Sequence, residues 1–277
     1  MIFLSEFAAF AIFLHCHDMK TKRPNMKKNL ILAFMASLLL VTSCNFDDGE
    51  DSYYTLNTSC FNIGYCRLSS ISGTFLDSLD AIVVSRILNS SEAYYYNSES
   101  RNLTNFADMC AKYADTTYDK SRTYTLDQLA PAFIADEFDT VKVTAVTNYD
   151  ASHPAGSDMG DIVTINTCSE YPFISSHYKT THDWSTIDES DIWGRWYSKS
   201  ILMDNYQSPV LKLLKDIKPH DLAMIGGKLY YGANMPFCIL HFNSKPTGSN
   251  TQTFSIEFNT DDNPAITYDC QVTGTFK

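Results

Sequence analysis

Glycine is scarce in this sequence, with 11 residues among 277, and recognisable catalytic motifs are absent. The chain contains no Gly-x-Ser-x-Gly turn, no His-Glu-x-x-His zinc motif and no glycine-rich phosphate loop. These absences argue against the enzyme classes that depend on such motifs. A glycosidase needs only two well-separated carboxylates, which leave no pattern in a sequence. We therefore expect a non-catalytic protein, with an unrecognised hydrolase as an alternative.

Long apolar runs and basic clusters are also missing. The longest apolar stretch, Leu30 to Val41, is shorter than the roughly 20 residues that a transmembrane helix needs. The whole chain has a formal charge of -11. Residues 1–43 contain five basic and two acidic residues, so 16 basic and 30 acidic residues remain after them, a charge of about -14. A surface of this sign repels phosphate backbones, and we expect no nucleic-acid partner.

The N-terminal region has the order of segments found in an export signal. Two lysines follow Met26, the apolar stretch comes next, and small residues precede Cys44. A basic start, an apolar centre and a small-residue end are typical of a signal peptide, which we place at residues 26–43. We interpret residues 1–25, which carry a second short apolar patch, as the result of a mis-assigned start.

The four residues Val41-Thr42-Ser43-Cys44 resemble the lipobox of bacterial lipoproteins. This resemblance implies that the Cys44 thiol receives a diacylglycerol and that the mature chain begins there. Two or more acyl chains make a stable membrane anchor, whereas a single chain is marginal. The alternative is an ordinary secretory signal with an accidental cysteine.

An acidic run, Asp47 to Asp51, follows the predicted lipidation site and contains four carboxylates in five residues. Such a run cannot pack into a core, so we interpret residues 44–58 as a solvated tether. The run also resembles the surface-export signal of Bacteroidetes lipoproteins. The resemblance implies a lipid-anchored protein of the outer membrane that faces outward, with a periplasm-facing anchor as the alternative.

Eight cysteines in an exported chain suggest a disulfide framework. Cys16 precedes the predicted cleavage and Cys44 carries the lipid, so an even set of six remains. Six cysteines allow fifteen pairings, and only the spacing of Cys60 and Cys66 favours a local bridge. The alternative is that several of them are small buried residues, above all Cys238 and Cys270. The six are Cys60, Cys66, Cys110, Cys168, Cys238 and Cys270.

Hydrophobic alternation predicts a mainly β protein. Apolar residues alternate with polar ones over Ile266 to Phe276 and over Phe254 to Phe258, and the polar stretch between them has turn chemistry, which predicts an antiparallel hairpin. Pro236 to Asn243 is the expected partner strand of this hairpin. Strands separated by polar loops favour an antiparallel β-sandwich. Further strands are expected at Ala81 to Leu88, Val141 to Thr147 and Asp161 to Cys168.

Two short helices accompany these strands. Asn102 is a suitable N-cap for a helix that places Leu103, Phe106, Cys110 and Tyr113 on one face. Ser208-Pro209 predicts a second helix, which ends near Pro219 and has Val210, Leu213, Leu214 and Ile217 on its inner face. No repeat or linker divides the mature chain, so we expect a single domain over residues 59–277 with insertions.

A further resemblance rests on the lipobox, the acidic tether and two segments of the mature chain, Asp139 to Asp150 and His153 to Ser157. Together they look like small Bacteroidetes surface lipoprotein families of unknown function. The resemblance implies an immunoglobulin-like or related β-sandwich and brings no catalytic residues.

One aromatic segment is a candidate ligand site. Trp184, Trp193 and Trp196 fall within thirteen residues and are accompanied by Asp191. Aromatic rings beside carboxylates suit a sugar face, although tryptophans also fill the ends of β-sandwiches.

No metal or cofactor site is expected, because the spacing of His177 and His182 matches no metal-binding pattern and Asp261-Asp262-Asn263 has the character of a solvated turn. The sequence thus favours a non-catalytic surface lipoprotein that acts as a binding or structural module. A glycan-binding lipoprotein is the second hypothesis. The expected partners are the membrane at Cys44 and a glycan or a surface protein.

Overall fold

The computed structural model describes residues 53–57, 59–95, 103–118, 121–125, 133–184, 205–227 and 235–277. The chain divides into the units Met1–Ser52 and Tyr53–Lys277, and every described residue lies in the second unit. The predictions for the signal peptide, for Cys44 and for the acidic run therefore fall outside the described residues. The end of the predicted tether was wrong, because Tyr53–Asn57 forms a strand that pairs with Ser121–Thr125. Within the part that the structure describes, no helix is long and apolar enough to cross a membrane.

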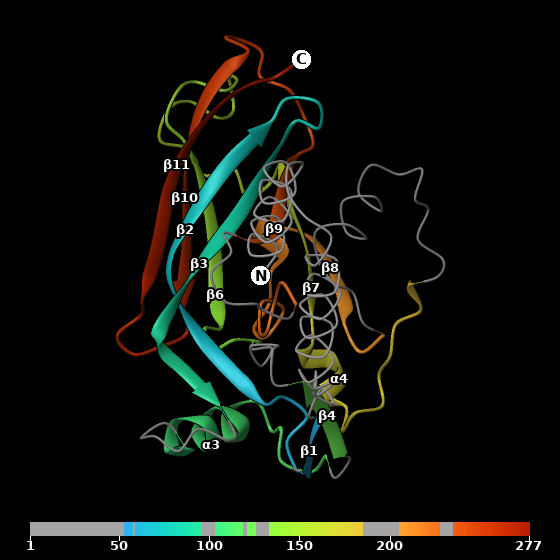
Figure 1. Ribbon diagram of the computed structural model, residues 1–277. Coiled ribbons are helices and arrows are strands. Elements are labelled where there is room, and N and C mark those ends of the chain that lie inside the picture. The colour runs from blue at the N-terminus through green and yellow to red at the C-terminus, as the bar shows by residue number, and fades with distance from the viewer. Residues whose placement is uncertain are drawn as a thin grey trace, which may run out of the picture. The chain divides into compact units, whose positions relative to one another are not determined.

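The fold is mainly β, as predicted, with two larger sheets and a two-stranded ladder among the described residues. Figure 1 shows the strands as long arrows and the helices as short elements. The strands are β1 (Tyr53–Asn57), β2 (Gly64–Leu76), β3 (Ala81–Tyr95), β4 (Ser121–Thr125), β5 (Phe133–Ile134), β6 (Phe138–Ala145), β7 (Val163–Ser169), β8 (Ser208–Leu213), β9 (Met235–Phe242), β10 (Thr251–Thr260) and β11 (Thr267–Thr275). The helices are α3 (Leu103–Lys112), α4 (Tyr171–Ser175) and the 3-10 turn η2 (Leu214–Asp216).

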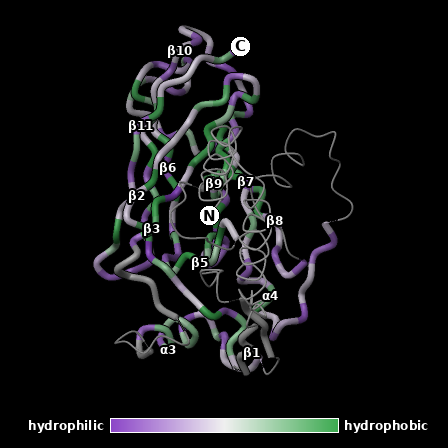
Figure 2. The backbone as a smooth tube through the Cα atoms, in the orientation of Figure 1, coloured by the Kyte–Doolittle hydropathy of each residue, from purple (hydrophilic) through white to green (hydrophobic). Residues whose placement is uncertain are grey.

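The three-stranded sheet has the order β11-β10-β6 and is antiparallel throughout. The predicted hairpin is confirmed, because β10 pairs with β11 from Thr251↔Thr275 to Asn259↔Thr267. Alternate side chains of β10 are buried, among them Phe254, Ile256 and Phe258, as period-two patterning requires. Figure 2 shows apolar and polar segments following one another along these strands.

The six-stranded sheet has the order β5-β2-β3-β9-β7-β8, and all its pairs are antiparallel except β2 with β5. The strands expected near residues 81–88, 141–147 and 161–168 are present as β3, β6 and β7. The run 236–243 is a strand, but the expected partner was wrong. It forms β9 between β3 and β7, where Phe237 to Leu240 are buried without alternation.

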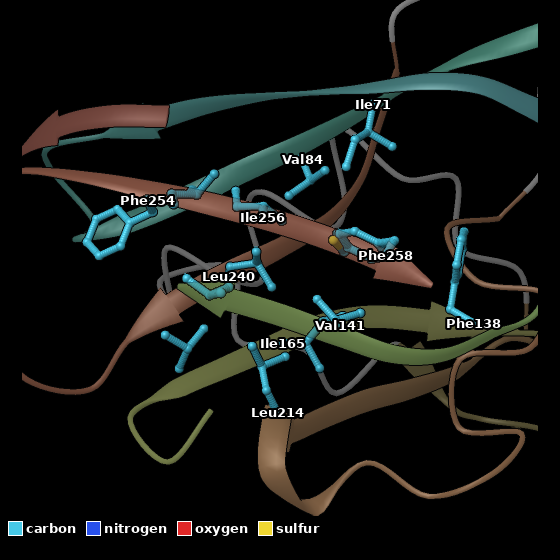
Figure 3. Packing of buried hydrophobic residues seen from close by; sticks show 14 of the residues in the cluster. Ile71, Val84, Phe138, Val141, Ile165, Leu214, Leu240, Phe254, Ile256 and Phe258 are labelled. Carbon is cyan, nitrogen blue, oxygen red and sulfur yellow. The ribbon is translucent and has the colours of Figure 1, made fainter. Parts of the chain in front are cut away.

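The main core lies between these two sheets (Figure 3). Phe254, Ile256 and Phe258 of β10 pack in one cluster with Val84 of β3 and Leu240 of β9. On one side the sheets meet closely, because a Cβ atom at Gly274 of β11 would lie 1.9 Å from Cγ of Phe75 on β2. Burial of this many aliphatic and aromatic side chains, each worth roughly 1.5–3 kcal/mol, supplies the main stabilisation of the fold.

A second hydrophobic cluster involves the two helices. The predicted helix at residues 103–112 is confirmed as α3, with Phe106, Cys110 and Tyr113 buried. They pack with Phe61 and with the α4 residue Phe173. The two clusters share β2, whose Tyr65 belongs to the second and whose Cys66 belongs to the main core.

The second predicted helix was wrong. Residues Ser208–Leu213 form the edge strand β8, and only the single turn η2 follows it. Val210 is buried while Leu211 is 66% exposed, which is strand alternation rather than a helical face. Pro209 of β8 lies opposite Cys168 of β7. Proline, which has no backbone N–H, is tolerated here because β8 is an edge strand among the described strands.

Candidate binding cleft at the edge of β6

Among the described strands, β6 is the edge of its sheet, and some of its backbone groups are used by no neighbouring strand. The Met159 amide donates to the Val143 carbonyl (2.8 Å) and the Ala145 amide donates to the Ser157 carbonyl (3.0 Å). The backbone N–H and C=O groups of the odd-numbered residues of β6 therefore point away from β10. Because backbone direction alternates along a strand, the N–H and C=O of Val141 point the same way. Among the described residues these two groups have no backbone partner. The 156–159 segment thus pairs with Val143 and Ala145 of β6 but stops before Val141.

A cleft of about 520 Å³ lies directly beside this edge. Its near wall is β6 from Asp139 to Lys142, and its far wall is η2 with the following Ile217. Val141 of β6, Ile165 of β7 and Leu214 of η2 belong to the main core (Figure 3). The volume falls within the usual range for ligand clefts, roughly 300–1,000 Å³.

The cleft combines an apolar interior with a charged rim. Val141 and Leu214 are buried and Ile217 is half-buried, so the wall groups nearest the core are aliphatic. The charged residues around them are Asp139, Asp158, Asp161, Lys142 and Lys215, which gives a local excess of one negative charge. A ligand with an apolar group and a basic group fits this distribution.

Hydrogen bonds in the 146–161 loop fix one end of the cleft. His153 lies between two carboxylates, with Nδ1 2.9 Å from Oδ1 of Asp150 and Nε2 3.0 Å from Oδ1 of Asp161. Burial alone would lower the pKa of His153, but the hydrogen bonds to Asp161 and Asp150 outweigh it and the pKa is raised. The Gly160 carbonyl accepts the Lys215 amide (3.0 Å), which joins the loop to η2. The cleft therefore has a hydrogen-bonded frame.

The tryptophan segment is described only at its start. Trp193, Trp196 and Asp191 lie outside the described residues. Trp184 is half-buried, donates its indole N–H to the Gln207 carbonyl (3.1 Å) and contacts the His182 ring edge-on, with the ring centroids 4.4 Å apart. The polar group of this ring is thus engaged within the protein.

The structure places the predicted pair Cys60 and Cys66 in different hydrophobic clusters. The six cysteines of the described residues carry thiols in the structure. Cys60 belongs to the second cluster, whereas the Cys66 thiol faces the main core and donates to the Arg67 and Asn89 carbonyls, both at 3.4 Å. Cys60 precedes β2 and Cys66 lies within it, and the two residues belong to different hydrophobic clusters.

The acidic turn after β10 is bound by basic residues. Arg67 bridges Asp262 (2.7 Å) and Asp136 (2.9 Å), and Lys112 pairs with Asp261 (2.8 Å). The hydrogen bond from Arg67 lowers the pKa of Asp262, whereas burial raises the pKa of Asp136. No group of three or more metal-ligating side chains occurs among the described residues. The turn is a set of ion pairs.

Arg86 is the other unusual charged residue, and it is closed to solvent. It is 1% exposed, its guanidinium donates to the Gly226 carbonyl (3.0 Å), and it lies over the Phe237 ring at 5.9 Å. Burial lowers the pKa of Arg86 to about 9. Because no solvent reaches this group, it serves the structure rather than a ligand.

Sequence patterns indicated the β6 strand but not the cleft. The cleft depends on Leu214 and Ile217, whose spacing predicts a helix. It also depends on the Val141 backbone groups, which have no backbone partner among the described residues. Only the pairing of strands shows either feature. Comparison of the chain with protein-family models, curated proteins and solved structures found no match.

Proposed function

We propose that this protein is a non-catalytic, membrane-anchored surface lipoprotein that binds an extended segment of a partner protein along β6. The observation that carries the binding part is the Val141 backbone, which has no backbone partner within the described parts of the chain and lies beside a cleft. Export, lipidation at Cys44 and the outward face rest on the signal peptide, the lipobox and the acidic run of the sequence.

Strand addition is the recognition mode that fits such an edge. A partner strand gains main-chain hydrogen bonds, and pockets for alternate side chains give specificity. The 156–159 segment runs antiparallel to β6, as its bridge between Thr144 and Asp158 shows. A ligand that continues this line is antiparallel to β6 as well, with one residue opposite Val141.

The cleft also selects the side chains of its ligand. Residues directly opposite each other in an antiparallel pair place their side chains on the same face of the sheet. Val141 points into the core, so the ligand residue opposite it points toward Leu214 and Ile217 and must be apolar. Its neighbours point outward, where three carboxylates outnumber Lys142 and Lys215 and favour a lysine.

The test is a hexapeptide that alternates valine and lysine, capped at both ends and labelled for fluorescence anisotropy with the full chain in mild detergent. We expect saturable binding. A second peptide carries N-methyl groups on its valines, whose amides face β6 in this arrangement, and we expect at least about a tenfold weaker affinity. A third peptide, N-methylated on its lysines, should bind as the first does. Equal affinity of the second and third peptides would disprove strand addition.

Two matched variants place the binding at this cleft. Ile217→Lys adds a positive charge to the apolar wall, and we expect about a tenfold loss of affinity for the lysine-containing peptide. Ile266→Lys makes the same change at a residue that is 38% exposed and lies outside the cleft. It should bind like the unmodified chain, and a loss in both variants would show non-specific charge repulsion.

A further inference from the structure

The loop before β2 is held against the end of α3 by buried hydrogen bonds. The Asp115 carboxylate accepts the backbone N–H of Phe61 (2.6 Å) and of Asn62 (2.8 Å). The Tyr118 amide donates to the Ser59 carbonyl (2.6 Å). Burial raises the pKa of Asp115, although the hydrogen bonds from the Phe61 and Asn62 amides act to lower it. Residues 59–62 and the chain after α3 are therefore fixed side by side.

Two cysteines lie within this region. Cys60 is next to Ser59 in the loop, and Cys110 is in the last turn of α3, where its carbonyl accepts the Asp115 amide (2.8 Å). Cys60 is 9% exposed and Cys110 is 2% exposed. The Cys110 thiol has the Cys60 thiol and the Tyr65 hydroxyl as hydrogen-bond partners. The hydrogen bond to Cys60, and then burial, raise the pKa of the Cys110 thiol.

We propose that Cys60 and Cys110 form a disulfide in the oxidised protein. The oxidant is a disulfide donor, either a small-molecule disulfide or an exchange-competent protein disulfide. The S–H bonds of Cys60 and Cys110 and the donor's S–S bond are broken, and one protein S–S bond and two donor thiols are formed. The protein loses two electrons and two protons, which the donor gains. In the cell this modification rests on the proposed export, because the cytosol keeps thiols reduced.

The other four cysteines lie in different surroundings. Cys66, Cys168 and Cys238 all interact electrostatically with the buried guanidinium of Arg86. Cys238 also senses Cys270, but no hydrogen bond joins these two thiols in the described structure. Burial raises the pKa of Cys168 to about 12 and that of Cys270 to about 11, so neither is a ready nucleophile.

The high pKa of Cys110 determines when the bond forms. Exchange requires a thiolate, and a buried thiol with a raised pKa reacts slowly in the folded protein. We expect the bond to form during folding, while the loop and α3 are still accessible. Once formed, it is shielded from reductants by the same burial.

The experiment refolds the full chain from denaturant in a mixture of reduced and oxidised glutathione, then blocks remaining thiols and maps the linked peptides by mass spectrometry. Cleavage after Phe61 and Tyr65 separates Cys60 from Cys66, so the two pairings are distinguishable. We expect one dominant linked pair, Cys60 with Cys110. A pairing of Cys60 with Cys66, or both Cys60 and Cys110 recovered as blocked thiols, would overturn the proposal.

Thermal unfolding of the unmodified chain gives a second readout. The loop closed by this bond spans about fifty residues, and we expect the oxidised chain to unfold about 10 °C above the same chain kept fully reduced. Cys270→Ser is the control, and it should keep both the linked pair and the shift. The refolding assay decides the pairing without reference to location, so its failure is distinguishable from a failure of export or of peptide binding.

Discussion

At the scale of single residues, the charged groups inside this protein are paired in ways that make them pH-dependent. His153 is the clearest case, because both ring nitrogens face carboxylates, those of Asp150 and Asp161. The pKa of Asp150 is lowered by its hydrogen bonds to His153, against the effect of desolvation, while the pKa of His153 is raised. The pair therefore favours the charged form of the histidine.

This arrangement predicts a loss of stability with rising pH. A group whose pKa is raised in the folded state contributes stability that is complete below its unfolded pKa, about 6.5, and is lost as the pH passes through the folded value. We expect the Tm to fall as the pH rises from about 6 to about 8.

His153→Asn should flatten this dependence, and Asp161→Asn should reduce it while keeping the ring. The measurement is thermal unfolding of the three chains over this pH range. An unchanged slope in His153→Asn would assign the dependence to another group.

Single residues also show where sequence reasoning stops. The alternation around Phe254 and Tyr268 predicted which side chains of the hairpin are buried, since period two is a local property. The spacing of Cys60 and Cys66 predicted a local bridge, but the two residues lie in different hydrophobic clusters, which spacing alone does not reveal. The Cys60 and Cys110 contact depends on Asp115, fifty residues or more from its backbone donors, and no local pattern encodes it.

At the scale of elements, the wrong predictions concerned short apolar runs, whose spacing is compatible with either a helix or a strand. Val210, Leu213, Leu214 and Ile217 have helical spacing, yet pairing with β7 makes the first part an edge strand. The run at β9 was read as a neighbour of the hairpin. Its continuous burial is typical of a central strand, and the structure places it between β3 and β7.

The contact of β11 with β2 is a second feature of this scale that can be tested. Gly274 faces the Phe75 ring so closely that a Cβ atom would lie 1.9 Å from Cγ and 2.5 Å from Cβ of Phe75. Gly274→Ala must therefore displace the ring, and we expect a loss of about 1–3 kcal/mol in the free energy of unfolding. The measurement is urea unfolding.

Two further variants control this result. Gly248→Ala should be nearly neutral, because nothing lies within 4 Å of its added Cβ. In a Phe75→Gly background, Gly274→Ala should cost much less than in the unmodified chain, because both the ring and the Cβ atom of residue 75 are gone. Additive losses in the double variant would contradict the close contact between the two strands.

At the scale of the whole molecule, the proposed address depends on Cys44. We expect mass spectrometry of the mature N-terminus to find this cysteine first in the chain and carrying diacylglycerol. Replacement Cys44→Ala should release the protein from the membrane fraction, since the anchor and not the body provides attachment. An unmodified Cys44 in membrane-bound protein would contradict the proposal. Protease treatment of intact cells separates the outward from the periplasmic face.

The second cluster gains a mechanical meaning if the chain is held by lipid at Cys44. Any pull on the tether then reaches the β1–β4 ladder first and residues 59–62 next, where it meets the Asp115 hydrogen bonds before it reaches the main core. The second cluster would therefore bear the force applied at the anchor. The β6 cleft belongs to the other cluster, through Val141 and Leu214, so shear on the anchor need not distort it.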